Sequence, residues 1–251
     1  MQKLEGRTAL VTGASAGIGA ATTRALVRAG AHVVAAARRG ERLAALVEEL
    51  GSNVTPLVLD VRAADSVQKA LAGDAFDLVV ANAGLGRGVD PLQSGDVEGW
   101  HEMIDTNIKG VLHVVRATLA GMLARGHGDV VLIGSVAGRQ VYPGGNVYNA
   151  TKHAVKALYE ALRLDAGGRG VRFTTVDPGM VETEFSEVRF GGDRERARAV
   201  YQGFTPLQPD DVADAILFAV TRPPHVNVGE LVLWPTDQAS TTIVRRDAPI
   251  A

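Results

Sequence analysis

Short apolar runs alternate with longer stretches of helical period along almost the whole chain, and this alternation restricts the folds that the chain can adopt. Seven runs are rich in Val, Leu, Ile and Ala and nearly continuous, which is typical of strands covered on both faces. They are Thr8–Val11, His32–Ala36, Val54–Leu59, Leu78–Ala81, Val130–Ile133, Arg172–Val176 and Leu231–Leu233. The helical stretches are Ile18–Ala29, Glu41–Leu50, Ala64–Ala72, Val97–Leu123, Ala150–Ala166 and Pro209–Thr221. We therefore predict an α/β fold: a single doubly wound, Rossmann-type domain over residues 1–251, with a seven-stranded parallel sheet and helices on both faces.

Composition narrows the partners that such a domain can have. The 251 residues are 46% hydrophobic, and 26 Lys and Arg nearly balance 28 Asp and Glu, for a net charge of −2. This balance provides no basic surface for nucleic acid or an anionic membrane, so we expect neither as a partner. No apolar run reaches the roughly 18 residues that span a bilayer and the start lacks a signal-peptide core, so we expect a cytoplasmic protein. The chain has no Cys and its six His are scattered, so we expect no metal site.

Two segments depart from the regular alternation. Residues 182–203 are rich in Gly and Arg, have weak periodicity and are long for a connection, which favours a substrate lid within the domain. Residues 240–251 form a polar C-terminal tail, which either reaches a neighbouring subunit or is disordered.

A glycine-rich turn follows the first predicted strand and opens the first predicted helix. Its glycines are Gly13, Gly17 and Gly19, in the spacing Gly-x-x-x-Gly-x-Gly rather than the usual Gly-x-Gly-x-x-Gly. At this point of a doubly wound fold, bare backbone amides can meet a pyrophosphate. The turn therefore predicts a dinucleotide site, and the alternative is a tight turn that only permits close helix packing.

The end of the second predicted strand indicates which dinucleotide binds. An NAD-binding protein places a carboxylate here for the adenosine ribose, but position 37 is Ala, and Arg38 and Arg39 follow it. A guanidinium matches a 2′-phosphate with paired donors, so Arg38, with Arg39 and Ser15, favours NADP(H). The alternative is a solvated pair of arginines before a helix. Asp60-Val61 closes the third strand, where Asp60 either reaches the adenine amino group or caps a helix.

A phenol and an ammonium group lie four residues apart in the helix predicted after the fifth strand. At this spacing Tyr148 and Lys152 are neighbours on one helical face, a coincidence that is rare in a chain with four Tyr and five Lys. Ser135 ends the fifth strand, at the sheet edge where such folds bind ligands. The alternative for the pair is a surface tyrosine packed on a lysine stem.

These motifs, in this order and spacing, resemble those of the short-chain dehydrogenase/reductase family. The resemblance runs from Arg7 to about Pro235 and rests on Thr12-Gly13-x-x-x-Gly17-x-Gly19, Asn82-Ala83-Gly84, Asn107, Ser135, Tyr148-x-x-x-Lys152 and Pro178-Gly179. One departure is Ala81, which stands where the family usually has the first Asn of Asn-Asn-Ala-Gly. Within the family, the strings from Ser135 to Tyr148 and from Glu184 to Phe190 look most like those of NADP-dependent 3-hydroxy acid and serine dehydrogenases.

The resemblance implies hydride transfer between the nicotinamide and an alcohol or carbonyl carbon, in a homotetramer. It implies a catalytic set of Asn107, Ser135, Tyr148 and Lys152, in which Lys152 also binds the nicotinamide ribose and Asn107 holds a water that links Lys152 to solvent. It further implies that Val181 and Thr183 meet the nicotinamide amide. The residues expected at NADP(H) are Gly13, Ser15, Gly17, Ile18, Gly19, Arg38, Arg39, Asp60, Val61, Asn82, Ala83, Gly84, Tyr148, Lys152, Pro178, Gly179, Val181 and Thr183.

Tyr148 is the expected proton donor, and its pKa must fall for that role. A free phenol has a pKa near ~10, too high to exchange protons readily in both directions at neutral pH. A Lys152 ammonium at roughly 4 Å and an effective dielectric of about 20 favours the phenolate by ~4 kcal/mol, which corresponds to a pKa lower by ~3. We therefore expect Lys152 to bring the Tyr148 phenol near neutrality, while Ser135 holds the substrate oxygen.

The substrate implied by the closer resemblance is a 3-hydroxy acid, whose carboxylate needs a cation in the pocket. Arg189 in the predicted lid is the first candidate and Arg139 the second, with Tyr142 and Phe185 as further substrate residues. Either arginine could instead face solvent. A broad-specificity NADPH-dependent reductase of aldehydes and ketones stays an alternative function, and a non-catalytic NADP(H)-binding regulator a remote one.

Overall fold

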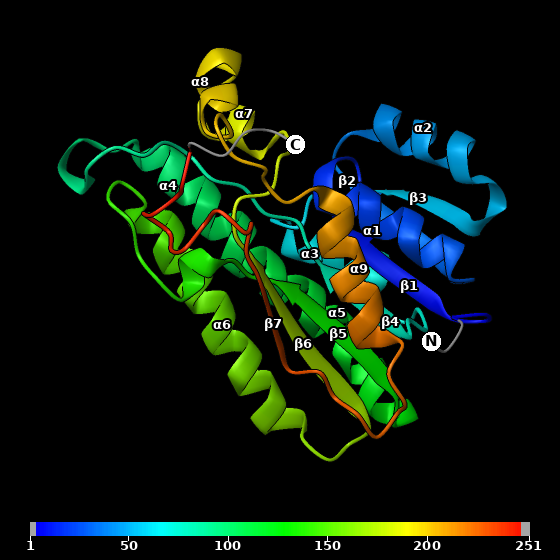
Figure 1. Ribbon diagram of the computed structural model, residues 1–251. Helices are drawn as coiled ribbons and strands as arrows, with labels where there is room; N and C mark the ends of the chain where they lie inside the picture. Colours follow the sequence, from blue (N-terminus) through cyan, green and yellow to red (C-terminus); the bar gives the residue numbers. More distant parts are fainter. Residues whose placement is uncertain (1–3, 247–251) are drawn as a thin grey trace.

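The computed structural model describes residues 4–246, and its centre is one sheet of parallel strands (Figure 1). The strands are β1 (Thr8–Thr12), β2 (His32–Ala37), β3 (Val54–Val58), β4 (Leu78–Ala81), β5 (Gly128–Ile133), β6 (Val171–Pro178) and β7 (Glu230–Leu233). Their order in the sheet is β3-β2-β1-β4-β5-β6-β7, and every neighbouring pair is parallel. All seven predicted strands are therefore confirmed.

Helices occupy the connections between the strands. They are α1 (Gly17–Arg28), α2 (Gly40–Leu50), α3 (Ala64–Leu71), α4 (Val97–Ile104), α5 (Gly110–Arg125), α6 (Asn146–Ala166), α7 (Phe185–Arg189), α8 (Arg194–Ala199) and α9 (Pro209–Val220). Short 3-10 turns cover Gly51–Asn53, Leu92–Ser94 and Val136–Gly138. Among the described residues, no helix has the length and apolar character needed to cross a membrane.

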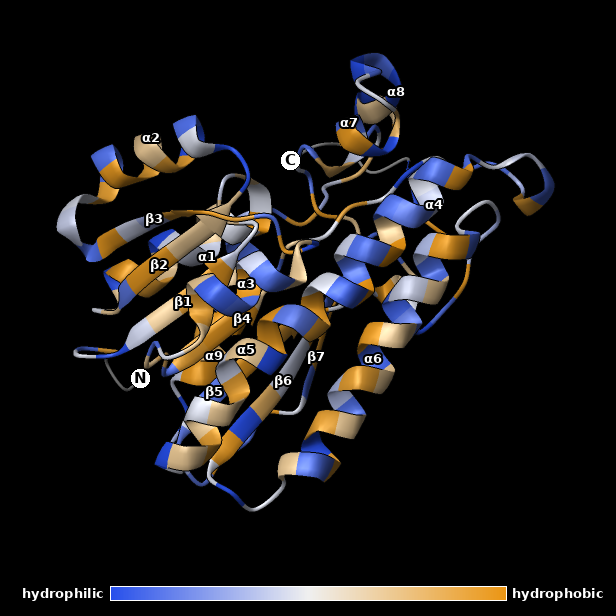
Figure 2. Ribbon diagram, turned by 180° about the vertical axis from the view of Figure 1, so that it is seen from behind, coloured by the Kyte–Doolittle hydropathy of each residue, from blue (hydrophilic) through white to orange (hydrophobic). Residues whose placement is uncertain are grey.

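The helices cover both faces of the sheet, as predicted (Figures 1 and 2). Apolar residues of α1, α2 and α9 pack on one face, and those of α3, α5 and α6 pack on the other. Successive strand side chains point to opposite faces, so that Leu10 and Val11, both 0% exposed, belong to different layers of the core. This double coverage explains why the strands are nearly continuously apolar.

The helix predicted over Val97–Leu123 differs from the structure. It is interrupted by a π-helical turn at Asp105–Lys109, which separates α4 from α5. Gly110 follows this turn and lies against Val61, three residues after the end of β3. A Cβ on Gly110 would be 2.7 Å from a side-chain carbon of Val61, so only glycine allows this close approach. Single-turn π-bulges of this kind often occur at functional sites.

The strand order creates the crevice in which such folds bind ligands. The chain leaves β1 toward β2 on one side, whereas β4 continues the sheet on the other side of β1. The connections after β1 and β4 therefore diverge at the carboxyl edge and leave a crevice between them.

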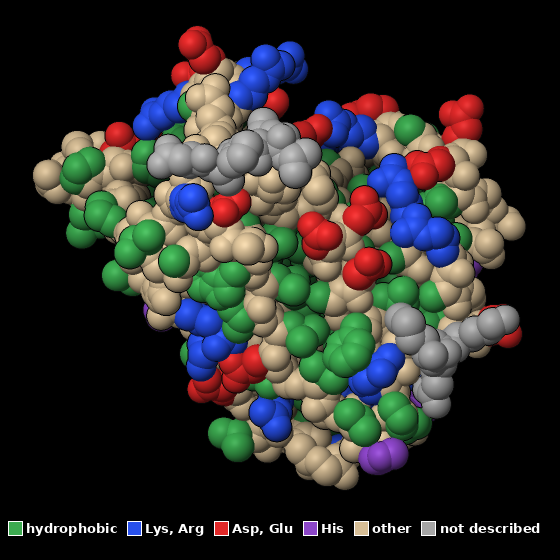
Figure 3. Space-filling view, viewed as in Figure 1, with side chains coloured by type: hydrophobic (Ala, Val, Ile, Leu, Met, Phe, Trp, Pro, Cys, Tyr) green, Lys and Arg blue, Asp and Glu red, His purple; other side chains and the backbone are tan. Residues whose placement is uncertain are grey.

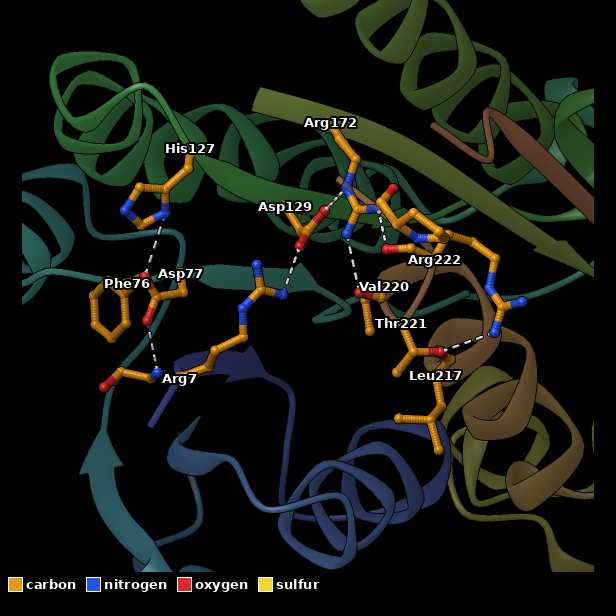
Figure 4. A network of polar contacts seen from close by, with 12 residues as sticks. Arg7, Phe76, Asp77, His127, Asp129, Arg172, Leu217, Val220, Thr221 and Arg222 are labelled. Carbon is orange, nitrogen blue, oxygen red and sulfur yellow. Dashed lines mark hydrogen bonds and ion pairs between the residues drawn. The ribbon is translucent and has the colours of Figure 1, made fainter. Parts of the chain in front are cut away.

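The opposite, amino-terminal edge is held by a buried carboxylate (Figure 4). Asp129, whose side chain is 5% exposed, accepts from Arg7 at 3.0 Å and from Arg172 at 2.5 Å. Arg172 also donates to the backbone carbonyls of Val220 and Arg222, at the end of α9. This network joins β5 and β6 to the residue before β1 and to α9, at the edge away from the crevice.

The segment predicted as a lid, 182–203, contains the short helices α7 and α8, which stand above the carboxyl edge in Figure 1. Residues 240–246 of the predicted tail pack on the same chain: Thr241 donates to Val141, and Arg246 donates to the carbonyls of Val200 and Gln202. Residues 247–251 of that tail lie outside the described residues. The lid stays a prediction.

Candidate active site

A cavity of about 470 Å³ opens at the carboxyl edge of the sheet, where the crevice lies. Every residue predicted at the cofactor lines it except Gly19: Gly13, Ser15, Gly17, Ile18, Arg38, Arg39, Asp60, Val61, Asn82, Ala83, Gly84, Tyr148, Lys152, Pro178, Gly179, Val181 and Thr183. Of the predicted substrate residues, Tyr142, Phe185 and Arg189 line it and Arg139 does not. The size falls in the range of ligand pockets, ≈ 300–1,000 Å³.

The glycine turn brings backbone very close to backbone. Gly13 has φ +67°, and a Cβ on it would lie 2.8 Å from Asn82 Nδ2. Gly19 does not line the cavity; a Cβ on it would lie 2.3 Å from the Gly13 carbonyl oxygen and 2.6 Å from Asn82 Nδ2, so only glycine lets α1 start this close to the turn. Thr12 Oγ1 accepts from the backbone N–H groups of Asn82 and Ala83, both at 3.1 Å, which fastens the turn to β4.

The start of α1 leaves amides available to an anion. Its N-cap residue is Ala16, which offers no side-chain acceptor. The first N–H groups of a helix have no partners within the helix, and the helix dipole there favours negative charge. Because Gly17 and Ile18 line the cavity at this end, the arrangement fits the pyrophosphate of a dinucleotide.

The two arginines after β2 are held differently. Arg39 donates to Ser15 Oγ from Nε at 3.2 Å and from Nη2 at 3.1 Å, and its Nη1 donates to Glu184 at 2.9 Å. The Arg38 side chain is 53% exposed and lies 3.8 Å from Glu102. Both guanidinium groups line the cavity, and no carboxylate stands at position 37, so this end fits a 2′-phosphate.

Asp60 also lines the cavity, but its carboxylate is engaged by its own turn. It accepts from the backbone N–H of Arg62 at 3.0 Å and from the Arg62 guanidinium at 2.6 Å. The Arg62 hydrogen bonds hold the pKa of Asp60 below its usual value. The following helix, α3, has Ala63 as its N-cap and no side-chain cap, so Asp60 does not cap that helix, and its contact with the adenine stays a prediction.

Tyr148, Lys152 and Ser135 meet at the inner end of the cavity. The Lys152 ammonium lies 5.9 Å from the centre of the Tyr148 ring and donates to the Ile133 carbonyl at 2.9 Å. Ser135 Oγ accepts from the backbone N–H of Ala137 at 3.1 Å and donates weakly to the Pro178 carbonyl at 3.4 Å. The helix α6 thus presents both titratable groups beside Ser135, which lies two residues after the end of β5.

The electrostatics of this cluster differ from the expectation that Lys152 alone acidifies the phenol. Burial raises the pKa of Tyr148, and the groups that oppose this are the Arg189 charge and a hydrogen bond with Ser135. Burial lowers the pKa of Lys152 to about 8, and the Asp177 carboxylate opposes that change. The cation nearest the Tyr148 ring is therefore the Arg189 guanidinium, while Lys152, with its pKa of about 8, is protonated at neutral pH and loses its charge as the pH rises through that value.

Asn107 lies behind the cavity and does not line it. Its amide donates to the Leu85 carbonyl at 2.8 Å and to Thr151 Oγ1 at 3.1 Å, and its oxygen accepts from the Leu85 N–H at 2.9 Å. The residue is 1% exposed and sits in the π-helical turn, which aims it at both segments. The water predicted for Asn107 stays a prediction.

Arg189 is surrounded by aromatic rings. Its guanidinium lies 4.7 Å from the ring centres of Tyr148 and Phe185 and 5.9 Å from that of Tyr142. Among residues 4–246, Arg189 Nε and the Tyr142 hydroxyl are two of five buried side-chain atoms without a hydrogen-bond partner of good geometry. Burial raises the pKa of Tyr142, and the charge of Arg189 and a looser polar contact with it oppose that rise, so the two side chains face each other. Buried polar groups are nearly always paired, so these two atoms mark a place for a polar ligand group.

Arg139 does not belong with these substrate residues, and its prediction is corrected. After Ser135 the chain makes a 3-10 turn, Val136–Gly138, which directs Arg139 toward β6 and β7. There its guanidinium binds Asp177 at 2.7 Å and also Glu230. The side chain is neutralised by two carboxylates outside the cavity.

Several cavity residues were not predicted. Glu184 places its carboxylate between Arg39 and Arg42 and so connects the turn before α7 to the arginine end of the cavity. Tyr201 donates to the Val181 carbonyl at 2.9 Å, and Gln238 accepts from the Met180 N–H at 2.9 Å. These partners are far apart in sequence, so no local pattern indicates them.

Comparisons with known proteins agree with this geometry. A family model described as short chain dehydrogenase matches residues 7–192. The chain is 44% identical over 236 residues, 92% of this chain and 95% of the other, to the NADP-dependent 3-hydroxy acid dehydrogenase YdfG of Shigella flexneri. A solved closed form of serine dehydrogenase complexed with NADP+ is similar at 43% identity and a TM-score of 0.92, over 94% of this chain and 98% of that chain.

A second solved structure, serine dehydrogenase from Escherichia coli, is 40% identical with a TM-score of 0.82, over 92% of this chain and 99% of that chain. The matched region contains the glycine turn, the Ser135, Tyr148 and Lys152 cluster and the strands that carry them. The chain therefore belongs to the short-chain dehydrogenase family.

Proposed function

We propose that this protein is an NADP(H)-dependent oxidoreductase that transfers hydride between the nicotinamide and the carbinol or carbonyl carbon of a 3-hydroxy acid or a similar small polar substrate. The observation that carries the substrate class is the buried, unpartnered Nε of Arg189 beside the Tyr148 ring. The relatives named for NADP and for 3-hydroxy acids or serine support the same assignment.

The residues present fit NADP(H). The glycine turn and the start of α1 accept the pyrophosphate, and Arg39 with Ser15 and the more exposed Arg38 accept the 2′-phosphate. Val181 and Thr183 also line the cavity and are the proposed contacts of the nicotinamide amide. When bound, NADP(H) supplies or accepts the hydride.

The proton is exchanged at the Tyr148 hydroxyl. In oxidation the phenolate takes the proton of the substrate hydroxyl, and in reduction the phenol returns it to the forming alkoxide. Ser135 Oγ accepts from the Ala137 N–H at 3.1 Å and donates to the Pro178 carbonyl only at 3.4 Å, so its hydroxyl can turn and donate to the substrate oxygen. Lys152 donates one N–H to the Ile133 carbonyl, and its remaining N–H groups donate to the ribose hydroxyls.

Arg189 and Tyr142 are the proposed carboxylate subsite. A carboxylate two carbons from the reacting carbinol accepts from Arg189 Nε and from the Tyr142 hydroxyl, which satisfies both unpartnered atoms. The surrounding rings exclude water and so strengthen the charge-assisted hydrogen bonds. Because Arg189 lies on α7, the segment 182–203 acts in this proposal as a substrate lid.

A second candidate function is a broad NADPH-dependent carbonyl reductase. The apolar lining by Leu85, Val136, Phe185 and Val188 favours it, because a neutral ketone would find apolar surface on several sides. The test measures kcat/KM for 3-hydroxypropanoate and for 1-propanol, each with NADP+ and with NAD+. The first proposal expects a clear preference for the acid with NADP+, whereas a preference for the neutral alcohol would favour the second.

The predicted assembly and location also stay proposals. Figure 3 shows apolar side chains gathered over the face that carries β7 and α9, and Val232 and Phe218 there are 39% and 44% exposed. Because β7 is also the edge strand, a second copy of the chain is the proposed occupant, within a homotetramer. Sedimentation velocity tests the assembly, and cell fractionation tests the cytoplasmic location.

A further inference from the structure

A buried carboxylate lies directly behind the proposed catalytic cluster. Asp177, near the end of β6, is only 3% exposed at its side chain. It accepts from Thr175 Oγ1 at 2.7 Å and from Arg139 at 2.7 Å, and Arg139 is shared with Glu230 on β7. None of these groups has a place in the proton transfer described above.

The carboxylate and the Lys152 ammonium contact the same short piece of chain. The Gly134 N–H donates to the Val176 carbonyl, beside Asp177, and a Cβ on Gly134 would lie 1.9 Å from Asp177 Oδ1. Lys152 Nζ donates to the carbonyl of Ile133, the residue before Gly134. Only a glycine at position 134 lets the carboxylate come this close to the turn that carries Ser135.

We propose that Asp177 is a positioning residue whose buried carboxylate keeps Lys152 protonated in the working enzyme, and that Arg139 limits this influence. Charge from a buried carboxylate reaches far, because little water screens it. Burial of the ammonium works in the opposite direction by favouring its neutral form. The inference deepens the proposed function, since it concerns the lysine that supports the tyrosine in that function.

The pKa directions agree with this geometry. Burial lowers the pKa of Lys152 to about 8, and Asp177 is the group that opposes the decrease. Asp177 is paired with Arg139, which also binds Glu230, and the Tyr148 ring beside the lysine is faced by Arg189. His153 follows Lys152 in α6, and Lys156 lies one turn further along that helix. Arg139, which neutralises Asp177, therefore decides how much of the carboxylate's charge reaches the ammonium.

The inference predicts two shifts of opposite sign. Asp177→Asn removes the negative charge, so the pKa of Lys152 falls, by about one unit if the pair behaves like ordinary close opposite charges. Arg139→Met removes the compensating positive charge, so the pKa of Lys152 rises. A role of these residues in packing alone would not move the same pKa in opposite directions.

The experiment is a carbon-13 NMR titration of the chain labelled at lysine Cε. Only five lysines are present, and Lys152→Met identifies the signal. Asp129→Asn is the matched control, because Asp129 is an equally buried carboxylate paired with two arginines at the far edge of the sheet. We expect Asp129→Asn to leave the Lys152 titration unchanged, and circular dichroism verifies the fold of each variant.

A second readout is the pH dependence of kcat. With Lys152 required in its protonated form, activity falls as the pH rises through the lysine pKa, so this decline occurs at lower pH in Asp177→Asn and at higher pH in Arg139→Met.

A Lys152 titration that neither variant moves, or that both move in the same direction, overturns the inference. If Asp177→Asn does not fold, the rise of the Lys152 pKa in Arg139→Met tests the inference by itself: no rise overturns it. Opposite shifts in a protein that turns over no alcohol would leave this inference standing and refute the proposed function instead.

Discussion

Replacing Arg189 with Met removes the proposed carboxylate contact and preserves most of the apolar volume of the side chain. The guanidinium lies among three rings, with Nε buried and unpartnered, so a substrate carboxylate would meet this nitrogen in a place where water competes little. Hydrogen bonds to charged groups contribute about 1.5–3 kcal/mol, and about 1.4 kcal/mol corresponds to a factor of ten. We therefore expect kcat/KM for 3-hydroxypropanoate to fall about 10- to 150-fold.

The same substitution affects the proton chemistry, and the assay must separate the two effects. The Arg189 charge lowers the pKa of Tyr148 against the effect of burial, so its loss raises that pKa. Oxidation needs the phenolate, so the rise of activity with pH moves to higher pH in Arg189→Met for every substrate. Full pH profiles for 3-hydroxypropanoate and 1-propanol therefore have to be compared on the plateau of each profile, between the rise set by Tyr148 and the decline set by Lys152, where the change at the tyrosine affects both substrates equally.

On the plateau, only the acid should show the large loss, and 1-propanol should change little. Arg196→Met is the matched control: Arg196 also lies on the segment 182–203, where it stacks on Phe190 at 4.3 Å, and it does not line the cavity. Equal losses for the acid and the alcohol on the plateau would refute the carboxylate subsite, because they would mean that Arg189 acts only through Tyr148 or through the packing of α7.

Three further outcomes are expected. Tyr148→Phe should lower kcat ~10²-fold or more while NADPH still binds, as followed by fluorescence titration, and near-normal turnover would remove the hydroxyl from the mechanism. Arg39→Ala should weaken NADP+ binding by about tenfold or more and leave NAD+ binding nearly unchanged in calorimetry, and equal losses for both would mean that Arg39 does not read the phosphate. Arg172→Met leaves Asp129 with Arg7 alone and should lower the free energy of unfolding by about 3 kcal/mol in urea; stability equal to that of the unmodified chain would mean that the buried pair contributes nothing net.

The elements of this fold were predictable because their signal is local. A strand covered on both faces must be apolar at successive positions, and β4, with all four residues Leu78–Ala81 buried, shows why the pattern is so plain. The break between α4 and α5 was not predictable in the same way. Nothing in Asp105–Lys109 is a helix breaker, and the contacts that accompany the π turn are made with distant residues: Gly110 approaches Val61, and Asn107 forms hydrogen bonds with Leu85 and Thr151.

The residues of the candidate site fall into the same two groups: those that local sequence predicts and those whose place depends on distant contacts. Gly13, Tyr148 and Lys152 act from positions that the backbone determines, a turn after a strand or one face of a helix, so their spacing alone placed them at one cavity. The arginines act through long side chains whose targets are set by distant parts of the fold. Arg139 follows Ser135 by four residues and yet turns away to Asp177, 38 residues further along, whereas Arg189 reaches the Tyr148 ring from a segment 41 positions later in the chain. Burial raises the pKa of Tyr148, and a contact of this second kind, with Arg189, opposes the rise. The cation that acts on the phenol therefore had to come from the structure and not from the Tyr148 and Lys152 spacing.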